Sequence, residues 1–113
     1  MMTNYIESKI IIPFSEQINP QNLEKIESII KHSTNVSPNI FIVKKDQFLC
    51  KYDIVFSINV FIKTEDFAKK LLEQIYNIIN TEICLDTYEN ELLMFHFSYD
   101  KDNFTFEEYQ KYF

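Results

Sequence analysis

The chain contains no glycine in 113 residues. Glycine is the residue that enters left-handed backbone conformations without a steric cost, so each such turn must fall to Asn or Asp. Candidates for these turns stand between the patterned segments, and they are Asn35, Asn39, Asn80, Asn90 and Asn103. The same absence excludes phosphate-binding P-loops, dinucleotide-binding turns and glycine-flanked nucleophile elbows, because each needs glycine at a close backbone approach.

The spacing of apolar residues predicts two strands and two helices in the first 80 residues. Residues 5–14 alternate as a strand, which Pro13 closes or places at an edge. Asn19 and Pro20 are typical of a helix start and precede a helical stripe over residues 20–32. A short strand over 40–44 and a turn at 45–47 follow, before a long central strand within 48–63.

Thr64 is the predicted cap of a second helix, which ends near Asn80. Strands over 83–88 and 91–99 are joined across Glu89 and Asn90 as a hairpin. The run from Thr105 to Glu108 matches a capping box and predicts a short C-terminal helix.

This order predicts one α+β domain over residues 1–113. The expected arrangement is ferredoxin-like, a split βαβ antiparallel sheet with two helices on one face. A C-terminal hairpin strand and the short helix complete it. Such a fold hosts many unrelated functions, so it does not by itself indicate one.

The charge of the chain is unevenly distributed. Up to Thr81 nine acids are matched by nine lysines, and after it eight acids face two lysines, so eight minus two accounts for the formal charge of −6. Arginine is absent. Nucleic-acid binding is therefore disfavoured, because it depends on Lys and Arg neutralising phosphates. The acidic third instead favours either simple solubility or docking to a basic protein.

We expect the docking residues to be carboxylates and tyrosines of the hairpin and tail, in which charges steer encounter and rings supply contact area. They are Asp86, Tyr88, Glu89, Glu91, Asp100, Asp102, Glu107, Glu108, Tyr109 and Tyr112. The leading hypothesis is a small inhibitor of the immunity or antitoxin type that neutralises a basic, nuclease-like toxin.

Two other functions remain open. Apolar residues on both faces of 55–61 indicate a homo-oligomeric regulatory or scaffolding module. Alternatively, His96 with Asp86 or Glu91 indicates a small hydrolase. The sequence leaves the oligomeric state open.

No metal site, cofactor or membrane contact is predicted. Cys50, Cys84, His32 and His96 are too widely spaced for a structural zinc site. The segment beginning at Asp100 lacks the later ligands of a calcium loop and is expected to be a solvated turn. No signal peptide or apolar span is apparent, so the expected location is the cytoplasm, with both cysteines reduced.

Overall fold

The computed structural model describes residues 5–14, 18–45 and 51–109. Their elements follow the order βαββαβββ. They are β1 (Ile6–Phe14), α1 (Pro20–Thr34), β2 (Asn39–Lys44), β3 (Tyr52–Ile58), α2 (Glu65–Ile79), β4 (Ile83–Glu89), β5 (Leu92–Asp100) and β6 (Asn103–Glu108). The protein is thus α+β, as predicted.

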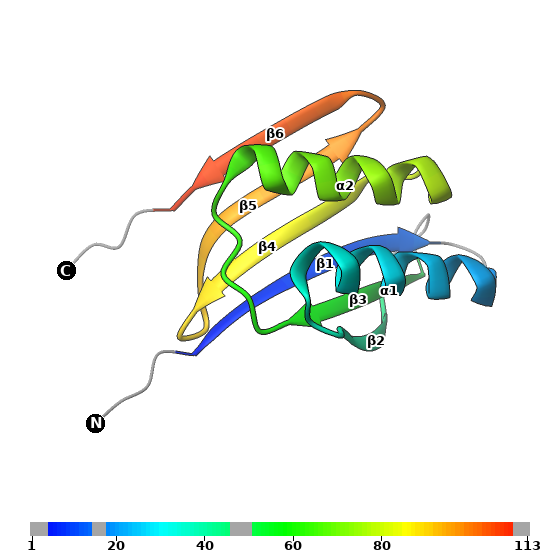
Figure 1. The fold of residues 1–113 in the computed structure, drawn as a ribbon, viewed down its shortest axis with the longest axis horizontal. Coiled ribbons are helices and arrows are strands. Elements are labelled where there is room, and N and C mark those ends of the chain that lie inside the picture. The colour runs from blue at the N-terminus through cyan, green and yellow to red at the C-terminus, as the bar shows by residue number, and fades with distance from the viewer. Residues whose placement is uncertain (1–4, 15–17, 46–50, 110–113) are drawn as a thin grey trace.

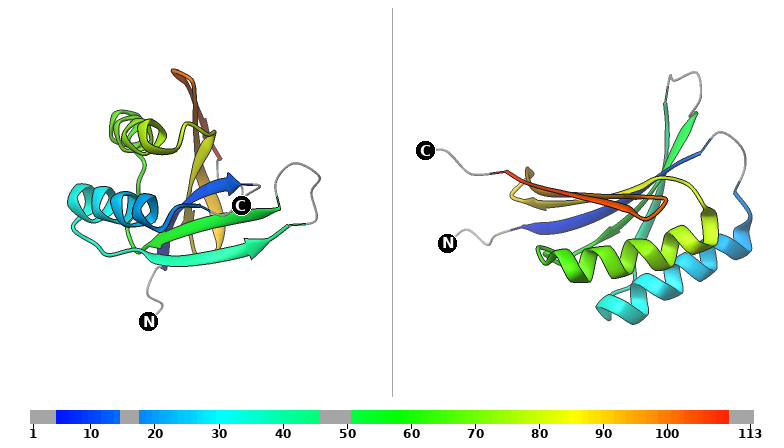
Figure 2. Two further views of the ribbon diagram at one scale, coloured as in Figure 1. Left: turned by 90° about the vertical axis from the view of Figure 1, so that its right-hand side faces the viewer. Right: turned by 90° about the horizontal axis from the view of Figure 1, so that it is seen from above.

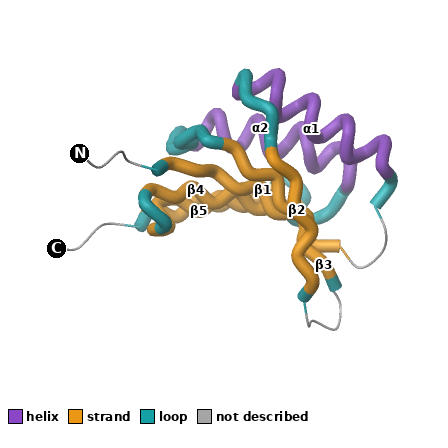
Figure 3. The backbone as a smooth tube through the Cα atoms, turned by 90° about the horizontal axis from the view of Figure 1, so that it is seen from below, coloured by secondary structure: helices purple, strands orange, loops and turns teal. Residues whose placement is uncertain are grey.

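The strands form one six-stranded sheet in the order β2-β3-β1-β4-β5-β6 (Figure 1). All neighbouring pairs are antiparallel. Both helices lie on the same face, with α2 packed against β4, β5 and α1 (Figure 2). The opposite face is covered by no helix of the described chain, as the tube in Figure 3 shows. We call it the open face.

The core lies between the sheet and the helices. Alternate residues of β1, β3 and β4 point into it, among them Ile10, Phe56 and Leu85, which are fully buried. The helices contribute residues at helical spacing, such as Ile26 and Leu72. The apolar residues that recur every second position in the strands and about every 3.6 positions in the helices therefore predict the buried faces correctly.

Both helices begin after the predicted cap residues and α2 ends just before Asn80 as predicted, whereas α1 continues two residues past its predicted end at His32, to Thr34. The side chain of Asn19 accepts a hydrogen bond of 2.9 Å from the backbone N–H of Gln21. Thr64 precedes α2, although its side chain makes no capping hydrogen bond. Asn35 and Asn80 close the two helices in left-handed conformations.

The strand predicted up to Lys63 ends earlier, at Ile58. β3 lies between β2 and β1, an inner position next to the edge strand rather than in the middle of the sheet. Beyond Ile58 the chain crosses toward α2, and the hydroxyls of Ser8 and Thr87 hold it there. Ser8 donates to the carbonyl oxygen of Val60 at 2.6 Å, and Thr87 to that of Ile62 at 2.6 Å. Residues 46–50, which include part of the predicted turn, lie outside the described residues.

The predicted capping box and start of a C-terminal helix at residues 105–108 are wrong, because residues 103–108 form β6. The remainder of the predicted helix, residues 110–113, lies outside the described residues. Phe106 stands directly opposite Phe97 of β5, with ring centroids 5.0 Å apart, and Phe104 packs on the same ring. A two-residue turn at Lys101 and Asp102 returns the chain along β5. Burial of alternate phenylalanines thus outweighs the local capping-box preference, which concerns one exposed turn.

Candidate protein-binding surface

A row of polar side chains crosses the whole open face. Lys9 of β1 stands opposite both Ser57 of β3 and Asp86 of β4. Asp86 stands opposite His96 of β5, which in turn stands opposite Glu107 of β6. Directly opposite residues share a face, so this row brings predicted docking residues from two different hairpins together.

Hydrogen bonds order this row. Nδ1 of His96 contacts Oδ1 of Asp86. The hydroxyl of Ser57 donates to the carboxylate of Glu7 at 2.5 Å. At the edge, the hydroxyl of Tyr109 donates to Oε2 of Glu107 at 2.7 Å. The charged groups of the face are therefore held in fixed positions rather than extended freely into solvent.

Tyr88 lies beside this row, at the end of the open face near the β4–β5 turn. Its ring lies under the ammonium of Lys9, with 5.2 Å between Nζ and the ring centroid. Glu7 is its cross-strand neighbour on β1. Tyr5, Glu7, Lys9, Tyr88 and Glu91 line one shallow hollow there. Five of the predicted docking residues thus lie on the open face in this row or between it and the β4–β5 turn, and we call them the acid–tyrosine surface: Asp86, Tyr88, Glu91, Glu107 and Tyr109.

Both tyrosines of this surface keep their protons more firmly than usual. The pKa of Tyr88 is raised by burial and by the charges of Asp86 and Glu7. The pKa of Tyr109, which is exposed, is raised mainly by its hydrogen bond to Glu107, and further by partial desolvation and by the charges of Glu107 and Asp86. Neutral hydroxyls that can donate hydrogen bonds therefore stand among carboxylates that accept them.

The other predicted docking residues lie elsewhere. Asp100 ends β5 and Asp102 lies in the β5–β6 turn, at the opposite end of β5 from Glu91 and the β4–β5 turn (Figure 1). The hydroxyl of Tyr99 donates to Oδ1 of Asp102 at 3.4 Å. Glu108 borders a hollow on the helix-covered side, next to Lys63 and Phe106. The acidic residues are therefore divided between two ends and two faces of the sheet.

Glu89 and Tyr112 are the remaining two of the ten predicted docking residues. Glu89, at the end of β4, stands opposite Ile6 of β1 and Leu92 of β5. Tyr112 lies outside the described residues. Glu7 and Lys9, which were not among the predicted docking residues, belong to the same face as Asp86 and Tyr88. Their alternation with Ser8 and Ile10 placed them away from the core, but only the pairing of β1 with β4 brings them beside the acidic hairpin.

Cys84 lies on the open face, two residues before Asp86. Its pKa is raised to about 11, mainly by burial and further by the charges of Asp86 and Glu82. At neutral pH the group is a protonated thiol, which makes it a poor nucleophile and a poor metal ligand. Within the described residues no group of three or more His, Cys, Asp or Glu side chains is arranged to hold a metal ion.

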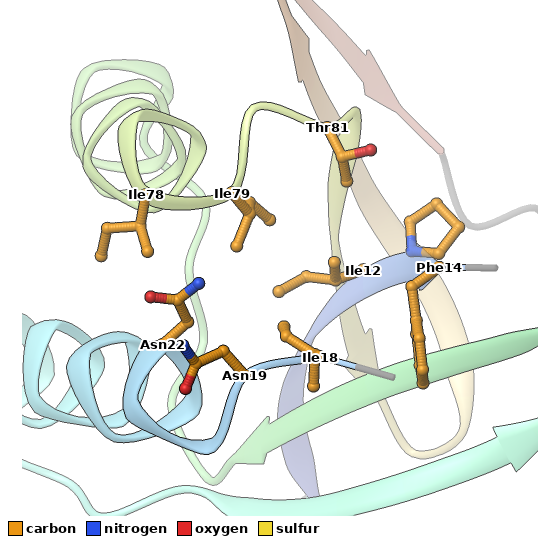
Figure 4. Close-up of a pocket in the computed structure, with 9 residues that line it drawn as sticks. Ile12, Phe14, Ile18, Asn19, Asn22, Ile78, Ile79 and Thr81 are labelled. Carbon is orange, nitrogen blue, oxygen red and sulfur yellow. The ribbon is translucent and has the colours of Figure 1, made fainter. Parts of the chain in front are cut away.

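A separate hollow lies at one end of the helix layer (Figure 4). Ile12 and Phe14 of β1, Ile18 before α1, and Ile78 and Ile79 of α2 line it. Its described lining includes no titratable side chain.

No family model, curated protein or solved structure matches the chain. The described helices include none long and apolar enough to cross a membrane.

Proposed function

We propose that the chain is a small protein-binding inhibitor of the immunity or antitoxin type. Its partner is a basic protein, such as a nuclease-like toxin, which docks on the acid–tyrosine surface. The observation that carries this proposal is the grouping of Asp86, Tyr88, Glu91, Glu107 and Tyr109 on a sheet face without helix cover. A nuclease must present a positive groove to nucleic acid, and an ordered set of carboxylates is complementary to such a groove.

The chemistry of the surface supports recognition rather than solubility alone. Solubility needs charge, but it does not need carboxylates fixed by Ser57, His96 and Tyr109. Fixed side chains lose less conformational entropy when a partner binds. Tyrosines supply contact area and a donor at the same point.

We further propose that β1 to β4 with both helices form the ferredoxin-like, split βαβ arrangement. The local order β2-β3-β1-β4 with antiparallel neighbours supports it. In this view β5 and β6 extend the sheet beyond β4. This extension supplies Glu107 and, just after β6, Tyr109 to the acid–tyrosine surface, and it carries His96, which contacts Asp86.

The test compares two double charge reversals. Glu91→Lys with Glu107→Lys alters the acid–tyrosine surface, and Asp100→Lys with Asp102→Lys alters the far turn by the same charge. Each variant and the natural chain serve as bait in lysate of the source cell. Proteins retained by the natural chain are identified by mass spectrometry and purified, and their dissociation constants are measured at several salt concentrations.

We expect the first variant to bind the partner at least about tenfold more weakly, with a reduced salt dependence, because charges that steer and hold the partner are reversed. The far-turn variant should stay within about threefold of the natural chain. Equal losses in both variants, or no loss in the first, would contradict docking on this surface. The partner must also be basic and lose its own activity when bound.

The contact between His96 and Asp86 favours a second candidate, a small hydrolase. A carboxylate that orients an imidazole is a common arrangement in general acid–base catalysis. His96→Ala separates the two functions. An inhibitor tolerates this change with a modest loss of affinity, whereas a hydrolase loses its turnover while still binding its substrate.

A further inference from the structure

The edge strand β2 carries large apolar side chains that the fold leaves exposed. They are Ile40, Phe41, Ile42 and Val43, of which Ile42 is 63% exposed. Ile40 and Ile42 stand opposite the core residues Phe56 and Ile54, so they belong to the helix-covered face, yet neither described helix buries them. Phe41 and Val43 belong to the open face. β2 is therefore exposed on both faces as well as along its edge (Figure 2).

The backbone of β2 also has one side that pairs with no strand of the described residues. The N–H of Lys45 donates to the carbonyl oxygen of Lys51 at 2.7 Å, which makes these two a hydrogen-bonded pair in the β2–β3 ladder. Hydrogen-bonded and non-hydrogen-bonded pairs alternate along an antiparallel ladder. By this alternation Phe41 and Val43 direct their N–H and C=O groups toward β3. Ile40, Ile42 and Lys44 direct theirs away from the sheet.

We propose that this edge binds the same edge of a second copy, so that two sheets join as an antiparallel β2–β2 dimer with Ile42 on the two-fold axis. Ile42 then forms a hydrogen-bonded pair with Ile42 of the second copy, and Ile40 pairs with Lys44 on either side. Each such pair exchanges two backbone hydrogen bonds. This inference does not depend on the proposed function of the acid–tyrosine surface.

The strand is complementary to itself in this register. On the open face Phe41 of each copy stands opposite Val43 of the other, an aromatic with a β-branched residue. On the helix-covered face the two Ile42 side chains meet, and Ile40 lies along the aliphatic part of Lys44. No charge stands opposite a like charge, since Lys44 faces Ile40. An identical strand thus satisfies both the apolar surface and the free backbone groups.

The distribution of charge favours this edge for self-association. The excess of acids begins after Thr81, which places it on β4, β5 and β6, and β2 lies at the other side of the sheet. In the dimer the two β4 strands would be roughly 34 Å apart, because seven strand spacings of about 4.8 Å separate them. This distance exceeds the screening length of about 8 Å at physiological salt. The edge at β6 carries the exposed Glu107 and Glu108 instead, and two copies meeting there would repel each other.

The first test measures the mass of the natural chain by light scattering after size-exclusion chromatography. The protein concentration is varied from about 1 to about 200 μM, because a small interface is expected to dissociate within this range. We expect a shift from 13.6 kDa toward twice that mass. Ile42→Lys should weaken dimerisation at least tenfold. Leu92→Lys is the matched control, because Leu92 is 57% exposed but lies on β5; it should leave dimerisation unchanged. Circular dichroism verifies that both variants fold.

The second test addresses the register by disulfide formation in a background with Cys50→Ser and Cys84→Ser. Two Cys residues at position 42 would have their Cα atoms about 5.5 Å apart, within the range of a disulfide. Ile42→Cys should therefore form a covalent dimer on oxidation, at least tenfold faster than Ile40→Cys, whose neighbour is Lys44. A monomer at every concentration, species larger than a dimer, an Ile42→Lys variant that still dimerises, or equal cross-linking at both positions would overturn the proposal.

Discussion

Six described residues adopt a left-handed backbone conformation although none of them is glycine. Asn35, Asn80 and Asn90 take this conformation, as the sequence predicts. Asn39 and Asn103 do not, since each begins a strand. Glu91, Lys101 and Asp102 take it in addition, within the two-residue turns of β4–β5 and β5–β6. Such turns require positive φ at both central residues, so the paired strands impose the conformation on side chains that disfavour it.

Lys101 is the residue at which this cost is easiest to measure. Its φ is 47°, and a residue with a Cβ loses about 1–2 kcal/mol in this region. Lys101→Gly should therefore raise the free energy of unfolding by about 1 kcal/mol, measured by urea denaturation. Lys69→Gly, in the middle of α2, is the control and should lower it by about 1 kcal/mol. A decrease in both variants would show that the turn is not strained.

At the scale of the elements, two buried hydroxyl groups fix the position of the segment between β3 and α2, which has no regular secondary structure. Ser8 and Thr87 are cross-strand neighbours on the helix-covered face, and both are fully buried. Their hydroxyls lie 3.2 Å apart and bind the backbone of Val60 and Ile62. The chain between β3 and α2 is thereby fixed across β1 and β4, and Ile62 enters the core although it lies outside any strand.

Thr87→Val tests this contribution, because it keeps the shape of the side chain and removes the donor. The carbonyl oxygen of Ile62 would be left buried without this partner, so the free energy of unfolding should fall by about 1–3 kcal/mol. Thr105→Val is the control: Thr105 shares a hydrogen bond with Ser98 on the open face but is exposed. It should change the free energy of unfolding by less than about 0.5 kcal/mol. Similar losses in both variants would contradict a special role for Thr87.

At the scale of the whole molecule, charge divides the sheet into two halves. The half with β2 and β3 has a balanced charge and an apolar edge, and the half from β4 to β6 carries the net charge of −6. This division separates the two proposed surfaces. In the proposed dimer a second copy meets the chain at β2, which leaves the acid–tyrosine surface on β4 to β6 accessible to another partner.

Repulsion within the acidic half predicts a dependence of stability on salt. Raising sodium chloride from about 0.02 to about 0.3 M screens charges on the surface, and the free energy of unfolding should rise by about 0.5–1 kcal/mol. The variant Glu107→Gln with Glu108→Gln should show a smaller rise, because two of the repelling charges are gone. Urea denaturation at each salt concentration measures both. A fall in stability with salt would mean that attractive ion pairs dominate.

The predicted site and the observed surface differ for reasons of topology. The sequence identifies the carboxylates and tyrosines, but sequence distance does not show that Glu91 and Asp102 lie at opposite ends of β5. A register shift between Thr87 and Tyr88 also places Leu93 opposite Tyr88. No alternation pattern in a single strand predicts such a shift, since it arises from the pairing of two strands.

The pattern of residues by itself determined the two helices, their cap residues, the buried faces of the strands and the segregation of charge. These are local properties, set by periodicity and by the conformational preference of single residues. Only the tertiary structure decided that residues 103–108 form a strand, where the β3 strand ends, and which acidic side chains meet. Each of these depends on pairing and packing between different elements, and the energy of those contacts exceeds the local preference they oppose.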